Sequence, residues 1–208
     1  MKRFLLAGII ACCTLQLSAQ VNIRVNYQGS RPTISDFLSS FAVAHEAAVE
    51  EEGCSDEAFN AINYAWDLHK RGLAQDQDDK LTVDERNGYI CLESTHMDDG
   101  IERTLRWEMC YWNESDGQHK LVAYNVTMFS NGKCDPGQFD GITFYRYNNA
   151  TKKMTLCDPP GFDRAFGTET GEWISYSLPR TGKDIVVTTW YAHGPKHKTL
   201  RWNGRIFQ

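Results

Sequence analysis

Short runs of alternating apolar and polar residues, separated by turn signals, fill the chain from residue 81 onward and constrain its fold most strongly. Asn87-Gly88 lies between the runs at 81–85 and 89–94, and Asn-Gly in that position is a strong hairpin signal. Further runs of this kind lie at 101–112, 120–129, 142–148, 152–157, 173–178, 184–191 and 198–207. We expect an antiparallel meander of about eight or nine strands, folded into a sandwich, a partial barrel or one strongly curled sheet. A parallel α/β fold is excluded because no helical pattern separates these runs.

The run at 101–112 has two chemically different faces. One face carries Leu105, Trp107, Met109 and Tyr111, and the other carries Arg106, Glu108 and Cys110. Such alternation is typical of a strand with one face in a core and the other in water. Glu108 is the first candidate for a catalytic acid, although a cross-strand ion pair with an arginine or lysine is the more ordinary role.

Residues 33–72 have the period of helices rather than strands. Thr33 and Asp36 predict a helix start, because a hydroxyl can cap the first turn and a carboxylate suits its positive end. A second helix is expected to start near residue 55 and to end at Gly72, which follows two cations. The simplest arrangement is a helical hairpin joined through Cys54 and packed on the open face of the meander. The fold class is therefore α+β.

The first nineteen residues predict a secretory signal peptide. Lys2-Arg3 supplies a positive start, residues 4–17 are mostly apolar, and Ser18-Ala19 offers a small-residue cleavage site before Gln20. Cleavage there leaves 189 of the 208 residues as one domain over 20–208, with a net charge of −7 instead of −5. A competing cut precedes Cys12, which would then carry a lipid. We expect a secreted or periplasmic protein, attached to a membrane only if Cys12 is lipidated.

Charge is divided unevenly along the chain. Residues 33–101 contain 16 acidic and 4 basic residues, whereas residues 151–208 contain 5 acidic and 9 basic residues. The acidic net charge argues against a nucleic-acid binder, and a mean hydropathy of −0.50 excludes a protein with many membrane spans. Either both segments are solvated surfaces, or the basic C-terminal strands contact an acidic ligand or the acidic helices.

The chain without its first nineteen residues keeps five cysteines: Cys54, Cys91, Cys110, Cys134 and Cys157. An odd number leaves at least one thiol outside intramolecular disulfides. If a turn at Asn149-Ala150 pairs the flanking strands, Cys157 lies opposite Ile142, where the loop from Cys134 arrives. We therefore expect a Cys134–Cys157 disulfide, which export would permit. A Cys91–Cys110 disulfide is less favoured, because a turn centred on Asp99 would separate the two residues by about 10 Å. A buried thiol is the alternative for each.

Two similar segments, 134–140 and 157–163, each begin with Cys-Asp-Pro after a predicted strand. Side by side, these loops would bring four carboxylates together as calcium ligands or ligand contacts: Asp135, Asp140, Asp158 and Asp163. Capping of ordinary Asp-Pro turns is the alternative role, and we expect no other cofactor. A zinc site at His193 and His197 is not expected, because Gly194-Pro195 forbids the helix that makes this spacing useful.

Tryptophan and tyrosine residues crowd the β region, and most of them are expected in the core. Trp112 and Trp190 differ, because each lies beside a turn or opposite the apolar set of its strand. Exposed tryptophans on a curved sheet are typical of sugar or peptide recognition, so both are candidate ligand contacts. A core on that second face, packed under the helices, is the alternative. No Gly-x-Ser-x-Gly motif or Gly-rich phosphate loop points to an enzyme.

The cut after Leu17-Ser18-Ala19, the hairpin at 145–154 and the closing segment at 200–204 together resemble secreted β-rich proteins of unknown function from Bacteroidetes-type bacteria. The resemblance implies an exported accessory protein and assigns no catalytic residue. We predict a non-catalytic protein that binds a ligand or partner, such as a carbohydrate or an envelope protein, through the loops and aromatic residues of its sheet. A hydrolase acting on a cell-envelope or dietary polymer is the alternative.

Overall fold

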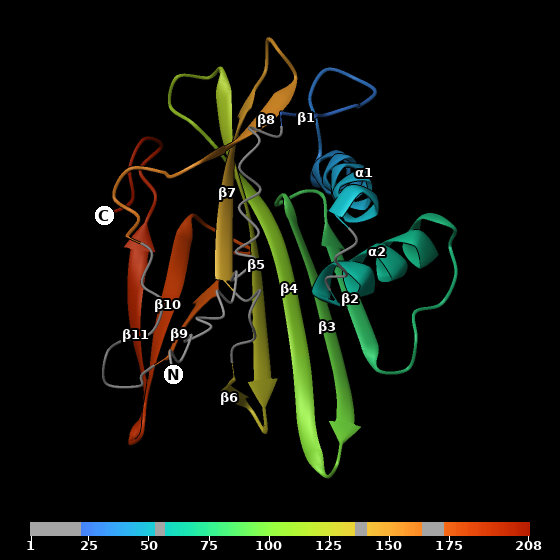
Figure 1. Cartoon of the computed structure of the whole chain (residues 1–208). Helices are drawn as coiled ribbons and strands as arrows, with labels where there is room; N and C mark the ends of the chain where they lie inside the picture. The colour runs from blue at the N-terminus through green and yellow to red at the C-terminus, as the bar shows by residue number, and fades with distance from the viewer. Residues whose placement is uncertain (1–21, 53–56, 136–140, 164–172) are drawn as a thin grey trace, which may run out of the picture.

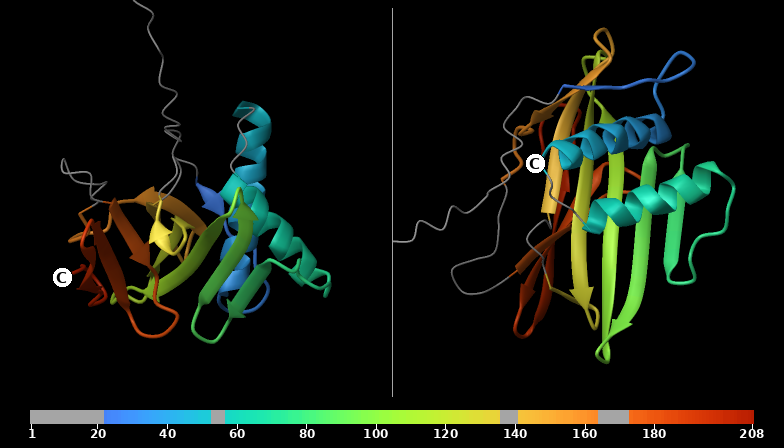
Figure 2. Two further views of the ribbon diagram at one scale, coloured as in Figure 1. Left: turned by 90° about the horizontal axis from the view of Figure 1, so that it is seen from below. Right: turned by 45° about the vertical axis from the view of Figure 1, so that its right-hand side comes forward.

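The computed structural model describes residues 22–52, 57–135, 141–163 and 173–208, which form three layers (Figure 1; Figure 2). The helices α1 (Ile34–Glu52) and α2 (Glu57–Lys70) lie on one face of a curled eight-stranded sheet, and a three-stranded sheet lies against the other. These are called below the large sheet, with its helix face and its opposite face, and the small sheet. An antiparallel α+β fold with a curled sheet is therefore confirmed. The proposed signal peptide and the link through Cys54 lie outside the described residues, so the helical hairpin stays a prediction.

The large sheet has the strand order β1-β8-β7-β5-β4-β3-β2, with β6 also paired to β5, and the small sheet has the order β11-β10-β9. Every strand pair is antiparallel. The strands of the large sheet are β1 (Ile23–Arg24), β2 (Asp79–Asp84), β3 (Tyr89–Asp98), β4 (Ile101–Asn113), β5 (His119–Ser130), β6 (Lys133–Cys134), β7 (Gly141–Asn148) and β8 (Lys153–Cys157). Those of the small sheet are β9 (Trp173–Ser177), β10 (Asp184–Tyr191) and β11 (Gly194–Arg201).

Local hydrogen bonds explain where the helices begin and end. Before α1, the Thr33 N–H donates to Asp36 Oδ2 at 2.7 Å and the Asp36 N–H donates to Thr33 Oγ1 at 3.4 Å, which is a reciprocal cap. After α2, the Leu73 N–H donates to the Leu68 carbonyl, and Gly72 adopts a φ of 66° that favours glycine. Both ends agree with the sequence-based expectation.

The last strand differs from its expected position. We expected a strand at 198–207, whereas β11 spans Gly194–Arg201 and continues β10 through a two-residue turn, with Tyr191 opposite Gly194. Pro195 is tolerated in β11 because this is an edge strand, where the missing N–H is not needed by a neighbour. The predicted strands on either side of Asn87-Gly88 are confirmed as β2 and β3.

The centre of β4 is buried on both faces, so the expectation of a half-buried strand is wrong. Trp107, Glu108, Met109 and Cys110 are each no more than 2% exposed. The odd-numbered residues of this centre face the helices, but Glu108 and Cys110 lie beneath the small sheet rather than in water. Alternation alone reveals two faces and cannot reveal that a later part of the chain covers the polar one.

The core on the helix face is organised around α1. Phe37 is fully buried, and its ring centroid lies 5.4 Å from that of Tyr111 and 5.1 Å from that of Tyr147. Phe41 packs on Phe59 of α2, at 5.0 Å between ring centroids, so both helices share this core. Aromatic rings in edge-to-face contact add to the free energy gained from burying apolar surface.

The core on the opposite face depends on residues near position 207. Phe207 is 1% exposed and packs against Trp112, Phe144 and Phe162. Its N–H donates to the Pro160 carbonyl, and a Cβ on Gly161 would lie 2.0 Å from the Phe207 carbonyl oxygen. Only glycine therefore allows this close approach.

Replacing Phe37 with alanine should lower the free energy of unfolding by about 3–5 kcal/mol, because it leaves a cavity beside the rings of Tyr111 and Tyr147. Urea unfolding followed by circular dichroism measures this loss. Val43→Ala, at a side chain that is 67% exposed on the same helix, is the control and should change the free energy by less than about 0.5 kcal/mol. Equal effects of the two substitutions would contradict this account of the core.

Candidate functional site

The opposite face of the large sheet changes from buried to accessible toward the β3–β4 hairpin. Three successive cross-strand rows run in that direction: Cys91–Glu108–Asn125, Glu93–Arg106–Thr127 and Thr95–Thr104–Phe129. The first row is buried, the side chains of Glu93 and Arg106 in the second are 34% and 36% exposed, and all three residues of the third are partly exposed. The small sheet therefore covers the first row and leaves an accessible edge at the third.

Two tryptophans of the small sheet lie at this edge. Trp190 and Trp173 are direct cross-strand partners, and the Trp190 ring centroid lies 6.1 Å from that of Phe129 on the large sheet. The Trp190 Nε1–H donates to Ser175 Oγ at 2.8 Å, which fixes the ring, whereas Trp173 is 50% exposed. Phe129, Trp173, Trp190, Thr95 and Thr104 are called below the sheet mouth. It lies at the end of β5 next to β6, at the bottom of Figure 1.

Glu108 joins the two sheets in the buried row. Its Oε1 accepts the Tyr89 hydroxyl at 2.8 Å, and its Oε2 accepts the Asn125 amide and the Leu178 N–H, each at 3.3 Å. The same Asn125 amide donates to the Tyr176 carbonyl at 2.8 Å. Two backbone groups at the end of β9 are thus held to the large sheet through neighbouring side chains on β4 and β5.

The expected ion pair of Glu108 is absent among the described residues, where Arg106 instead binds Glu93 Oε1 at 2.6 Å. Burial raises the pKa of Glu108, although the hydrogen bonds of Tyr89 and the charge of Arg106 oppose that shift. Burial also raises the pKa of the Cys91 thiol to about 11, so this thiol is a poor nucleophile. With 2% exposure, Glu108 cannot reach a substrate as an acid catalyst.

Replacing Glu108 with alanine should lower the free energy of unfolding by about 3 kcal/mol, because the Leu178 N–H and the Tyr89 hydroxyl lose their acceptor while staying buried. Equilibrium urea unfolding at pH 7 measures the change. Glu102→Ala, at an exposed position of the same strand, is the matched control and should leave the midpoint nearly unchanged. A midpoint shift no larger than that of the control would show that this network does not hold the sheets together.

The other sequence-predicted contacts do not gather at one place. Trp112 is 4% exposed in the core with Phe207, so it has no free ring face for a ligand. Asp135 accepts Ser130 Oγ at 2.5 Å and lies 3.5 Å from Arg103 Nη1. Asp158 and Asp163 follow β8, and Asp140 lies outside the described residues. In the part of the chain that the structure describes, these carboxylates form no group close enough to share an ion.

The proposed Cys134–Cys157 disulfide does not form, and none joins any of the four cysteines in the described residues. Asn148 pairs with Lys153, two residues later than expected, so Cys157 lies opposite Phe144. Phe144 in turn lies opposite Ala123, while Cys134 lies opposite Phe129. These levels differ by six residues along β5, or about 20 Å, which is far beyond disulfide reach. The alternative partner of Cys110, Cys91, lies opposite Glu108 instead of Trp107.

The protein, denatured without reductant and treated with iodoacetamide, should be alkylated at both Cys134 and Cys157, because no disulfide joins them. Peptide mass spectrometry reads each site, and a sample reduced before alkylation is the control. Labelling of this pair only after reduction would contradict the register of β7 and β8.

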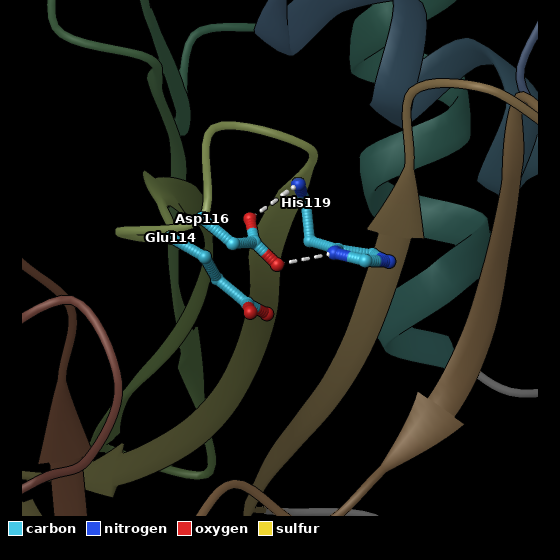
Figure 3. Close-up of side chains that lie close together, drawn as sticks. All are labelled: Glu114, Asp116 and His119. Carbon is cyan, nitrogen blue, oxygen red and sulfur yellow. Dashed lines mark hydrogen bonds and ion pairs between the residues drawn. The ribbon is translucent and has the colours of Figure 1, made fainter.

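One cluster with metal-ligand chemistry was not found from the sequence. Glu114, Asp116 and His119 surround the β4–β5 turn, with one ligand atom of each lying within 4.8 Å of the others (Figure 3). Arg146 already binds Glu114 Oε2 at 2.5 Å and lies 3.4 Å from Asp116 Oδ2. Hydrogen bonds from His119 lower the pKa of Asp116 to about 2. Arg146 thus forms ion pairs with both carboxylates, and this network connects β4, β5 and β7. The only sequence signal was the turn motif Ser115-Asp116-Gly117.

The basic C-terminal strands do not contact the acidic helices. β10 and β11 lie on the far side of the large sheet from α1 and α2 (Figure 2, left). His197 lies in β11, with its Nδ1 2.9 Å from Thr188 Oγ1, and His193 stacks on Tyr191. The two histidines belong to no cluster of metal ligands among the described residues.

Comparison with known proteins assigns no family: no family model, curated protein or solved structure matches the chain. Neither helix of the described part combines the length and apolar character needed to cross a membrane.

Proposed function

We propose that this protein is a non-catalytic binding protein that takes a carbohydrate at the sheet mouth. The observation that carries the proposal is the junction of Trp173, Trp190 and Phe129, which brings aromatic rings of both sheets to an accessible edge. Sugar rings present C–H faces that pack on aromatic rings, and most of the area buried in such a contact is apolar.

Polar groups beside these rings suit the hydroxyls of a sugar. Thr95 and Thr104 face each other at 3.0 Å between their hydroxyl oxygens, and both are partly exposed. The ion pair of Arg106 and Glu93, about one third exposed, lies one row deeper. Hydroxyls and a half-exposed ion pair offer both donors and acceptors, which is how a binding site fixes the orientation of a polar ligand.

The observations favour binding over hydrolysis of a polymer. A hydrolase needs an acid and a second carboxylate or nucleophile that touch the substrate. Glu108 lies beneath the small sheet, and burial keeps the Cys91 and Cys110 thiols protonated. We further propose that the protein works outside the cytoplasm, either released after Ala19 or anchored through Cys12.

Replacing Trp173 with alanine should weaken carbohydrate binding about tenfold, since one lost stacking contact costs on the order of 1–1.5 kcal/mol. Isothermal titration with soluble pentamers of glucose, N-acetylglucosamine and galacturonic acid identifies a binding sugar and measures the change. The control is Tyr64→Ala, which removes an aromatic ring that is 52% exposed on α2, away from the mouth. Absence of binding by every pentamer, or equal weakening by both substitutions, would contradict the proposal.

A further inference from the structure

We propose that Glu108 is a proton-sensitive clamp, which holds the small sheet on the large one and thereby sets how firmly the sheet mouth is closed. Its two carboxylate oxygens lie between the sheets with 2% exposure, and the clamp consists of Glu108, Asn125 and the backbone groups of Tyr176 and Leu178. This inference rests on the proposed function only in naming what closure does for a ligand.

Among the residues that the structure describes, the groups that face Glu108 include no direct counter-ion. They come from every element packed around it: Tyr89 and Cys91 on β3, Arg106 and Cys110 on β4, Asn125 on β5, and the Leu178 N–H after β9. Arg106 is engaged with Glu93. A carboxylate enclosed in this way is favoured by three hydrogen-bond donors but penalised by loss of water, and burial has the larger effect.

Glu108 is the member of this group whose ordinary pKa, 4.5, lies on the acid side of neutrality, and burial raises it. Burial raises the pKa of Tyr89, and that of Cys91 to about 11, so both stay protonated at and below neutral pH. A second tie joins the segment after β9 to the large sheet: the ion pair of Arg180 with Asp84 of β2, 2.9 Å between nitrogen and oxygen. Hydrogen bonds lower the pKa of Asp84 to about 2. That tie therefore remains charged throughout.

The direction of the response follows from linkage. The folded protein holds the proton on Glu108 more tightly than an opened state in which water reaches the carboxyl group. Opening therefore releases the proton, and it becomes more favourable as the pH rises above the ordinary glutamate value of 4.5, until the folded pKa is passed. Low pH therefore favours the closed state. Each unit of pH increase in this range raises the equilibrium constant for opening by up to about tenfold.

The buried thiols of Cys91 and Cys110, which are 7% and 2% exposed, report this opening. Their rates of reaction with N-ethylmaleimide, divided by the rates in urea-unfolded protein at the same pH, give the open fraction independently of thiol ionisation. We expect the normalised rates to rise between pH 5 and pH 8 and to be independent of pH in Glu108→Gln. The glutamine can donate to the Tyr89 oxygen and accept from Leu178, as a protonated glutamate does. Glu102→Gln is the matched control and should keep the slope of the unmodified protein.

Tyr89→Phe gives a second test that does not alter the carboxyl group. It removes a donor that favours the charged form and thereby raises the pKa of Glu108 in the closed state, so the open fraction should keep rising to a higher pH before it levels off. Equal pH dependence in the unmodified protein and Glu108→Gln, or no pH dependence in the unmodified protein, would overturn the clamp. Both results are obtained without ligand, so they leave the carbohydrate titration as a separate test of the proposed function.

Discussion

Burial of the large sheet on both faces is the constraint on which the rest of the structure depends. The registers of β3, β4 and β5 put odd-numbered β4 residues under the helices and even-numbered ones under the small sheet. At the centre of the strand the second of these sets includes Glu108 and Cys110, which alternation alone would place in water. Because Glu108 is buried, its carboxylate needs hydrogen-bond donors, and these come from Tyr89, Asn125 and Leu178.

Glu108 is a buried acid with no direct cation among the described residues, which is costly, and its position explains why the cost is tolerated. Glu108 connects β4 with the end of β9 through the Leu178 N–H, a contact that an apolar residue could not make. Specific polar contacts orient two layers more narrowly than apolar packing does, because they require particular donors and acceptors. At the other end of β9, Trp173 pairs with Trp190, whose ring contacts Phe129, so the polar network and the aromatic mouth lie at opposite ends of the same strand.

Helix ends and tight turns could be predicted from the sequence, whereas the arrangement of segments far apart in the chain could not. Thr33, Gly72 and Asn87-Gly88 marked ends and turns correctly, because each acts through neighbours within a few residues. Loop length was not predicted correctly: the turn after Asn148 is two residues longer than expected, which moves Cys157 by two positions, and Cys134 pairs with Phe129 near the far end of β5. The exposure of Trp173 and the burial of Trp112 depend on which layer covers each strand, which no local pattern records.

The contact between Gly161 and Phe207 has a consequence for the order in which the chain can fold. Most of the helix-face core comes from residues between Ile23 and Met154, which leave the ribosome early. The opposite-face core needs Trp202 and Phe207. A chain synthesised only to residue 200 therefore leaves Trp112 and Phe144 without the ring of Phe207 that packs on both. Until those last contacts form, this half of the sheet is exposed apolar surface and a natural binding site for chaperones.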